Sequence, residues 1–354
     1  MIKLRNMKIE RKEFETEKGK AELFRIENGS GAWVEVSSLG AGITGVGVPD
    51  RDGRIENVAL RYASPADYLY DGPCLGKTPG RYANRIARGH LVVEGKEYKL
   101  AANNGPNHLH GGPDGFANRI WNSEPLADGV RFTYLSKDGE ENYPGNLKAS
   151  VTYRWSEENR LSIDFEAESD AATVVNLTNH AYWNLGGADS GTALEHEMRM
   201  KASRWLPTDS TQIPTGEKAP VAGTPMDFME FKTLGRDIHA DFEALKIGKG
   251  YDHCWVIDGW KPGEMVENAV ELRDTRSGRC LGVWSDQPGV QVYTGNWLEG
   301  CAANCSGRGY ADYDGVAIEM QGFPDAPNHP DFPTQTLLPG EIYRRRIIYA
   351  FGLA

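Results

Sequence analysis

The sequence LKASVTYRW (residues 147–155) alternates apolar and polar side chains, and so does LSIDFEA (161–167), which follows a polar turn at 156–159. Successive side chains of a β-strand point to opposite faces, so a period of two predicts a strand with one buried face. Two such runs joined by a short polar segment predict an antiparallel hairpin. This period, rather than the 3.6-residue period of a helix, dominates the chain.

Strand patterns recur on both sides of this hairpin. They predict strands at 22–27, 33–36, 43–48, 91–93, 98–100, 173–178, 266–272, 290–293, 316–320 and 342–351. Only 229–245 has a mixed pattern that suits short helical turns. The chain has no repeat of fixed period and no Pro/Gly/Ser-rich linker. We therefore expect an all-β protein: one large antiparallel β-sandwich of two layers, with few short helices, in a single domain spanning 1–354.

The charge balance limits the kinds of partner. The formal net charge is -11, from 39 Lys and Arg against 50 Asp and Glu, whereas nucleic acid and anionic membranes need clustered cations. A neutral small molecule fits better. Nine Trp and fifteen Tyr suit a sugar site, because pyranose C–H faces stack on aromatic rings. The same aromatic residues also suit the core of a β-sandwich.

Two features indicate a compartment. The segment 1–14 has five basic residues and no apolar stretch, so it is not a secretory signal, and no later run is long enough to span a bilayer. The five cysteines are odd in number and scattered, which favours reduced thiols over a disulfide framework. Cys301 and Cys305 lie four apart, but no second pair completes a zinc site. We expect a cytoplasmic protein.

The densest group of chemically useful side chains is NHAYWNL (179–185). The β-branched run at 173–178 predicts a strand that ends just before it, so we expect His180 at the end of a strand and open to a cleft. An imidazole in that position suits a general acid. The alternative is a half-buried structural histidine whose ring nitrogens bind the backbone.

A carboxylate in VAIEMQ (316–321) offers the matching base. Alternation places the apolar side chains on one face of this strand and Glu319 on the other, which is equally the pattern of a strand with a solvated face. A glutamate with a pKa near ~4.3 is ionised at neutral pH, and a histidine near ~6.5 can be held protonated by a nearby anion. Glu319 and His180 together predict a base and an acid available at once.

Three further polar segments are candidates for substrate binding. In GRYANRI (80–86), the planar fork of Arg85 can hold two neighbouring hydroxyls, and the alternative is a structural ion pair. NHLHGG (107–112) has two histidines, of which only one need reach a cleft. A cupin-like metal site fails there because no Glu or Cys follows before Glu124, so we predict no metal. Asp252, in GYDH, is either a sugar-binding carboxylate or an ordinary turn residue.

An acid and a base of this kind suit the opening of a cyclic hemiacetal. The base removes the proton from the C1 hydroxyl while the acid protonates the ring oxygen, the C1–O5 bond breaks, and the aldehyde rotates about C1–C2 before the ring recloses. The reverse steps use the same groups, so both must exchange protons near neutral pH, as a Glu/His pair does. No cofactor is required.

Six ordered segments of the chain resemble the aldose 1-epimerase (galactose mutarotase) family. They are GRYANRI (80–86), NHLHGG (107–112), NLTNHAYWNL (176–185), GYDH (250–253), QPGVQVYTGN (287–296) and AIEMQGFPDAPNHPDFP (317–333). They span most of the chain. The resemblance implies a large antiparallel β-sandwich, of the galactose mutarotase-like supersandwich type, with the site in its concave face.

The resemblance also implies roles position by position. His180 is implied to be the general acid toward the ring oxygen, and Glu319 the general base at the C1 hydroxyl. The implied substrate-binding residues, with His110 near the ring oxygen, are Asn84, Arg85, His110, Tyr182, Asp252 and Gln287. The expected function is that of an isomerase that interconverts the α and β anomers of a free aldose such as galactose or glucose. It would need no cofactor, and it would be a monomer or homodimer.

Other functions remain open from the residues alone. A glycoside hydrolase can use Glu319 and Asp252 as its carboxylate pair, but it gives His180 no role. A non-catalytic sugar-binding protein needs the aromatic cleft but no acid–base pair. A phosphosugar epimerase needs a basic pocket, for which the candidates are Arg81, Arg85 and Arg88.

Overall fold

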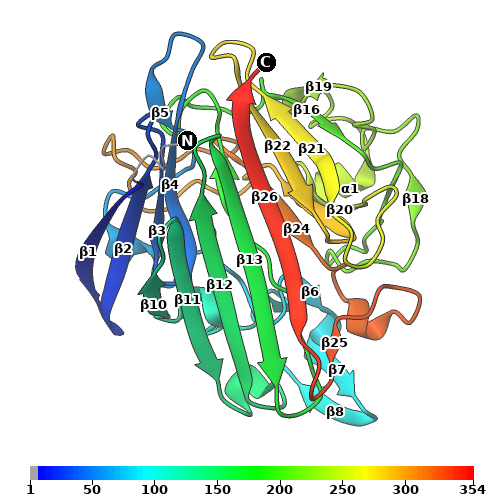
Figure 1. Cartoon of the computed structure of the whole chain (residues 1–354). Helices are drawn as coiled ribbons and strands as arrows, with labels where there is room; N and C mark the ends of the chain where they lie inside the picture. The colour runs from blue at the N-terminus through cyan, green and yellow to red at the C-terminus, as the bar shows by residue number, and fades with distance from the viewer. Residues whose placement is uncertain (1–6) are drawn as a thin grey trace.

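The computed structural model describes residues 7–354, which form mainly antiparallel strands (Figure 1). Within them the largest sheet has nine strands, in the order β10 (Asn122–Pro125), β11 (Gly129–Ser136), β12 (Leu147–Trp155), β13 (Arg160–Ser169), β26 (Tyr343–Leu353), β22 (Arg279–Ser285), β21 (Val266–Arg273), β16 (Glu197–Met200) and β19 (Lys232–Thr233). A second sheet has six strands, in the order β15 (Tyr182–Trp183), β24 (Val316–Gln321), β23 (Gly289–Tyr293), β20 (Asp252–Val256), β17 (Arg204–Trp205) and β18 (Ala219–Pro220).

Smaller sheets complete the strands of the described chain. A five-stranded sheet follows the sequence through β1 (Lys8–Thr16), β2 (Gly19–Glu27), β3 (Trp33–Ser37), β4 (Gly42–Pro49) and β5 (Ile55–Asn57). Three strand pairs join β6 (Arg85–Ile86) to β9 (His108–Leu109), β7 (His90–Val93) to β8 (Lys96–Lys99), and β14 (Thr173–Val174) to β25 (Thr336–Leu337).

The hairpin that indicates the fold class is confirmed. β12 pairs with β13 in antiparallel register, from Leu147 opposite Ser169 to Trp155 opposite Leu161. Alternate side chains of both strands are buried, as a period of two requires. In Figure 1, β13 lies between β12 and β26 in the large sheet.

The two large sheets pack face to face as the layers of a sandwich. One cluster of buried side chains includes Val151 and Phe165 from the nine-stranded sheet and Val292 and Ile318 from the six-stranded sheet. The hydroxyl of Tyr349, on β26, donates a hydrogen bond to the carbonyl of Ile318 at 3.1 Å and so joins the layers. The expected all-β antiparallel sandwich is confirmed.

The strand predicted at 173–178 is shorter than expected. β14 ends at Val174, and the chain then continues without a long ladder. Polar side chains bind the neighbouring backbone in place of strand partners. The hydroxyl of Thr178, for example, donates to the carbonyl of Met320 at 2.7 Å. Side chains that can bind backbone groups compete with ladder formation, which the β-branched pattern does not reveal.

Several strands were not predicted, and β1 and β11 are the longest of them. β1 is a mostly exposed strand at the edge of its sheet, and its charged side chains hide any apolar alternation. β11 does alternate, with Val130 and Phe132 buried, and was simply missed. Of the basic segment 1–14, residues 1–6 lie outside the described residues.

Helical structure is sparse in residues 7–354. The segment 229–245 contains a 3-10 turn at Leu234–Arg236 and the start of α1 (Glu243–Gly248), so the short helical turns predicted there are confirmed. The other 3-10 turns lie at Pro65–Tyr68, Ala87–Gly89, Phe116–Asn118, Glu140–Asn142 and Ala326–Asn328. In this part of the chain no helix has the length and apolar character needed to cross a membrane.

Candidate active site

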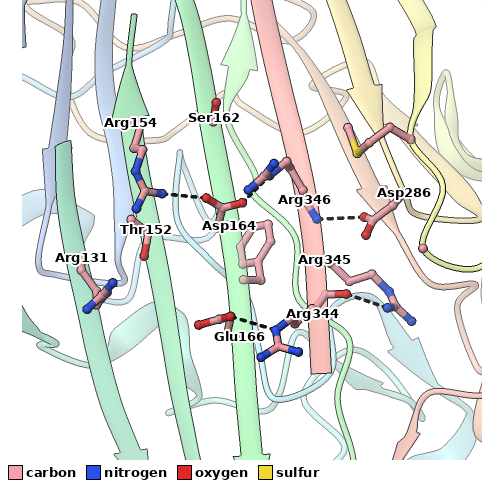
Figure 2. Close-up of a pocket in the computed structure, with 13 residues that line it drawn as sticks. Arg131, Thr152, Arg154, Ser162, Asp164, Glu166, Asp286, Arg344, Arg345 and Arg346 are labelled. Carbon is pink, nitrogen blue, oxygen red and sulfur yellow. Dashed lines mark hydrogen bonds and ion pairs between the residues drawn. The ribbon is translucent and has the colours of Figure 1, made fainter. Parts of the chain in front are cut away.

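A hollow of about 660 Å³ lies on the outer face of the nine-stranded sheet (Figure 2). Four of its five arginines have carboxylate partners. Arg154, for example, donates to Asp164 at 2.8 Å, and Arg344 donates to Glu166 at 3.1 Å. These pairs are partly exposed to solvent. Exposed pairs of this kind are the ordinary covering of a solvated sheet face, so this hollow is not the candidate site.

A smaller cavity, of about 310 Å³, contains the predicted chemistry. Seven of the eight predicted site residues line it, although they come from segments far apart in the sequence: Asn84, Arg85, His110, His180, Tyr182, Asp252 and Glu319. The other lining residues are Gly72, Pro73, Cys74, Asn104, Leu109, Gln212, Tyr293 and Trp297. The fold thus brings the separate motifs to one place.

Gln287 is the predicted site residue that the structure does not bring to the cavity. It is fully buried, and its side-chain nitrogen donates to the carbonyl of Leu177 at 3.2 Å. Gln291, four residues later, donates instead to Asp252 Oδ1 at 2.7 Å. Both glutamines lie in the motif QPGVQVYTGN, and the motif alone does not show which of them contacts a residue of the site.

His180 lies on an irregular segment rather than at the end of a strand. Its backbone N–H donates to the carbonyl of Lys77, and its carbonyl accepts from the N–H of Gly76, both at 2.9 Å. The side chain of Asn179 also donates to the carbonyl of Gly76, at 2.8 Å. The loop 71–77 therefore holds the backbone of His180 from both sides, and three of its residues form a wall of the cavity.

A buried ion pair between Lys77 and Asp71 closes this loop. The two side chains are only 2% and 4% exposed. The ammonium group of Lys77 also donates to the carbonyl of Tyr68 at 2.7 Å, and Asp71 Oδ2 accepts from the N–H of Leu75 at 2.8 Å. A buried charge that loses its partner is costly, so this pair fixes the loop that holds His180.

We expect the substitution Lys77→Met to destabilise the protein by about 3–5 kcal/mol, because it leaves the Asp71 carboxylate buried without its cation. Thermal unfolding followed by circular dichroism should show a clearly lower Tm. The matched control is Arg344→Met, which breaks a largely exposed pair with Glu166 and should leave the Tm nearly unchanged. Equal Tm values for the two variants would contradict this account of the loop.

Glu319 lies on β24, between β15 and β23 in the six-stranded sheet. Its neighbours Ile318 and Met320 belong to the main core, whereas Glu319 lines the cavity and is 2% exposed. The predicted alternation is therefore confirmed, and a solvated face is excluded.

His180 Nε2 lies 3.5 Å from Glu319 Oε1. Neither Glu319 Oε2 nor His180 Nδ1 has a hydrogen-bond partner among the described residues. Buried polar atoms left free in this way point to a polar ligand.

Burial shifts the pKa of both members of this pair toward their neutral forms. Desolvation, reinforced by the charge of Asp252, raises the pKa of Glu319 well above its usual range. Burial lowers the pKa of His180 to about 4. Burial therefore acts against the expectation that the glutamate holds the imidazole protonated. For a single proton shared by the pair, burial favours its position on the carboxyl group.

The two histidines of NHLHGG diverge. His108 is buried, with each ring nitrogen 2.7 Å from an oxygen of the surrounding protein. His110 has a φ of 52° and faces the cavity, where its ring centroid lies 5.3 Å from that of His180. One histidine reaches the cleft, as predicted. Within residues 7–354, no three His, Cys, Asp or Glu side chains are grouped in a way that could hold a metal ion.

The protonation of His110 follows from its partners. The backbone N–H of Asn84 donates to His110 Nδ1 at 3.2 Å, so the neutral ring carries its proton on Nε2. Burial, and to a smaller extent the neighbouring His180, lowers the pKa of His110 well below its usual value. His110 is therefore a neutral hydrogen-bond donor.

Arg85 and Asp252 form a polar wall of the cavity. Arg85 Nη2 lies 3.6 Å from Asp252 Oδ2, and Arg85 Nε donates to Asn104 Oδ1 at 3.1 Å. Gln212 bridges the two charged groups: Arg85 Nη2 donates to Gln212 Oε1 at 2.5 Å, and Gln212 Nε2 donates to Asp252 Oδ2 at 2.9 Å. Arg85 is thus both part of an ion pair and a lining residue.

Aromatic side chains cover the remaining surface. The hydroxyl of Tyr182 donates to the carbonyl of Pro73 at 2.8 Å, and the rings of Tyr182 and Tyr293 lie 5.9 Å apart. Trp297 is 64% exposed and marks the rim. The lining residues that the sequence analysis missed include Asn104, Gln212, Tyr293 and Trp297. Tyr293 lies inside a quoted motif, whereas Gln212 lies in a loop with no motif.

Fold and site together define an acid–base enzyme built on a large antiparallel β-sandwich. The family model described as Aldose 1-epimerase matches residues 22–350. The galactose mutarotase of Sus scrofa is 40% identical over 336 residues, which cover 95% of each chain. The galactose mutarotase of Homo sapiens is 42% identical over 321 residues, which cover 91% of each chain. The crystal structure of galactose 1-epimerase from Lactobacillus acidophilus matches with a TM-score of 0.85 at 30% identity, over 98% of this chain and 99% of that one.

The chain belongs to the aldose 1-epimerase family. It is accordingly an isomerase with mutarotase function, and the resemblance and the reaction predicted from the sequence are both confirmed. The glycoside hydrolase and the non-catalytic sugar-binding protein are set aside as alternatives.

Proposed function

We propose that this mutarotase acts on free galactose, with Glu319 as the general base at the C1 hydroxyl and His180 as the general acid at the ring oxygen. The observation that carries this proposal is the 3.5 Å separation of His180 Nε2 and Glu319 Oε1 in a cavity where each residue keeps a free buried polar atom. In a cyclic aldose both reacting oxygens are bonded to C1. An acid and a base this close together can therefore serve both oxygens of one sugar.

Ring opening uses the ionic form of the pair. The carboxylate of Glu319 takes the proton of the C1 hydroxyl, and the imidazolium of His180 gives its proton to O5 as the C1–O5 bond breaks. The raised pKa of Glu319 makes the carboxylate a stronger base, and the lowered pKa of His180 makes the imidazolium a stronger acid.

Ring closure uses the neutral form. After ring opening, Glu319 carries a proton and His180 is a neutral base, which is the arrangement that burial favours. Once the aldehyde has rotated about C1–C2, His180 takes the proton of the C5 hydroxyl while Glu319 returns a proton to O1. The other anomer forms, and the pair regains its ionic form with no net change in protons.

The remaining lining residues bind and orient the sugar. His110 donates from Nε2 toward the ring oxygen, and Arg85 and Asp252 bind hydroxyls, with Asn84 and Tyr182 beside them. Among the described residues that line the cavity, Arg85 is the only lysine or arginine, and Asp252 lies next to it. This balance supports a neutral sugar over a phosphosugar.

Two further features of the chain support proposals about its cellular compartment and its number of domains. All five cysteines are free, which supports a reducing compartment, the cytoplasm. The main cluster of buried side chains runs from Phe24 to Phe351, which supports a single domain. The oligomeric state, a monomer or homodimer, is a proposal from the sequence alone.

Polarimetry of freshly dissolved sugars tests the proposed function. The optical rotation of α-galactose should reach its equilibrium value faster with the protein than in buffer, at a rate proportional to protein concentration. The same assay with α-glucose and α-xylose ranks the sugars by kcat/KM. A higher kcat/KM for glucose or xylose would overturn the assignment of galactose. If no sugar relaxes faster than in buffer, the acid–base assignment fails as well.

A further inference from the structure

Gln212 lies between the two charged side chains of the polar wall. Its carbonyl oxygen accepts from Arg85 Nη2 at 2.5 Å, and its nitrogen donates to Asp252 Oδ2 at 2.9 Å. Gln212 also lines the cavity. A neutral amide thus connects a cation and an anion that are 3.6 Å apart.

The local backbone holds Gln212 in place. Asp209 Oδ1 accepts from the N–H groups of Thr211 and Ile213, at 2.7 and 3.2 Å, and the N–H of Gln212 donates to the carbonyl of Asp209 at 3.0 Å. Gln212 has a φ of 64°, in the left-handed region that residues other than glycine rarely adopt. A side chain held at such a conformation is fixed by its surroundings rather than by its own preference.

The amide changes what the charged pair can offer to a ligand. A guanidinium and a carboxylate this close tend to pair directly, often through two parallel hydrogen bonds that use both oxygens. Here Gln212 takes one hydrogen bond from Arg85 and gives one to Asp252 Oδ2, while Gln291 occupies Asp252 Oδ1 at 2.7 Å. Each charged group is aligned, yet each keeps hydrogen-bonding capacity for a ligand.

We propose that Gln212 is a positioning residue for sugar binding, which holds the ion pair of Arg85 and Asp252 at 3.6 Å and prevents it from closing into direct hydrogen bonds. The ligand chemistry that fits this arrangement is a pair of adjacent hydroxyls, one accepting from Arg85 and the other donating to Asp252. The inference rests on the proposed function, because it assigns Arg85 and Asp252 to the sugar. The new element is that the affinity of Arg85 and Asp252 for the sugar depends on the neutral side chain of Gln212, which comes from a different loop.

The substitution Gln212→Leu tests the inference. Without the amide, Arg85 and Asp252 should form direct hydrogen bonds to each other, and KM for galactose should rise roughly tenfold, the equivalent of one hydrogen bond to a charged group. The kcat should change by less than about twofold, because Glu319 and His180 are untouched. The matched control is Ser210→Ala, at an exposed position of the same loop, which should leave both constants unchanged.

The substitution Gln212→Glu separates positioning from simple packing. It keeps the size of the side chain but places a carboxylate beside Asp252, so KM should rise at neutral pH. As the pH falls and the added carboxyl group takes up a proton, it regains a donor and an acceptor, and KM should return toward the wild-type value. A packing role gives no such dependence on pH. This variant also keeps the test valid if the leucine variant does not fold.

The outcomes separate this inference from the proposed function. Wild-type KM in a folded Gln212→Leu variant, or a loss confined to kcat, overturns the role of Gln212. A KM of Gln212→Glu that does not change with pH overturns it too. Absence of turnover in the wild-type protein overturns the proposed function instead.

Discussion

Replacing Glu319 by glutamine should lower kcat roughly 10²–10⁴-fold, the usual contribution of a positioned general base. The amide has nearly the shape of the carboxylate but cannot take the proton of the C1 hydroxyl. Its polar atoms can still bind the sugar, so KM should change little. Both constants follow from polarimetry of α-galactose over a range of sugar concentrations, and calorimetric titration checks that sugar binding is kept.

The matched control for this substitution is Glu166→Gln, on the outer face of the nine-stranded sheet (Figure 2). That glutamate is largely exposed and pairs with Arg344 at 3.1 Å. It lies in the nine-stranded sheet, whereas Glu319 lies in the six-stranded sheet. Its loss should leave kcat and KM as in the wild type. A Glu319→Gln variant with near wild-type kcat would show that another group removes the C1 proton.

The fold was predictable because its signal is local. The period of two in 147–155 and 161–167 depends only on which side of each strand meets the core, and the structure pairs these strands as expected. Glu319 was predictable for the same reason: a polar residue out of phase with its apolar neighbours must lie on the opposite face. What the period leaves open is whether that face meets water or a cavity.

The position of His180 shows where local patterns fail. The run 173–178 is β-branched, yet after Val174 its polar side chains bind the backbone of other segments. The backbone of His180 is held instead by the loop 71–77, about a hundred residues earlier in the chain. Such a loop has no periodic signature, because its form depends on one buried ion pair and on tertiary contacts.

Gln212 and Gln287 show a second limit. Gln212 belongs to no quoted motif and acts through partners 127 and 40 residues away along the chain. Gln287 lies in a motif, but the structure buries it behind the cavity. The protonation states of Glu319 and His180 were also beyond prediction from the sequence, because a sequence does not show how strongly each group is desolvated.

The second large effect is expected for His180→Asn, which removes the proton donor to O5 while keeping a polar side chain of similar size. The kcat should again fall roughly 10²–10⁴-fold. The control is His108→Asn, because that histidine is buried outside the cavity. Its substitution should lower the Tm, since it removes two buried hydrogen bonds, but should not lower the kcat of the folded protein by a comparable factor.

The dependence of kcat/KM on pH gives this substitution a distinct signature. In the wild type, Glu319 and His180 together must carry one proton to be active. The kcat/KM should therefore fall at low pH only below about pH 4, where His180 is protonated as well as Glu319. It should fall again at high pH, as the single proton is lost through the raised pKa of Glu319.

In His180→Asn only Glu319 remains and must be ionised to act as a base. Its residual rate should therefore rise with pH across the range where the wild type is flat. A wild-type profile centred on an ordinary histidine pKa near ~6.5 would contradict the shared proton, because it would mean that His180 titrates as though it were exposed to water.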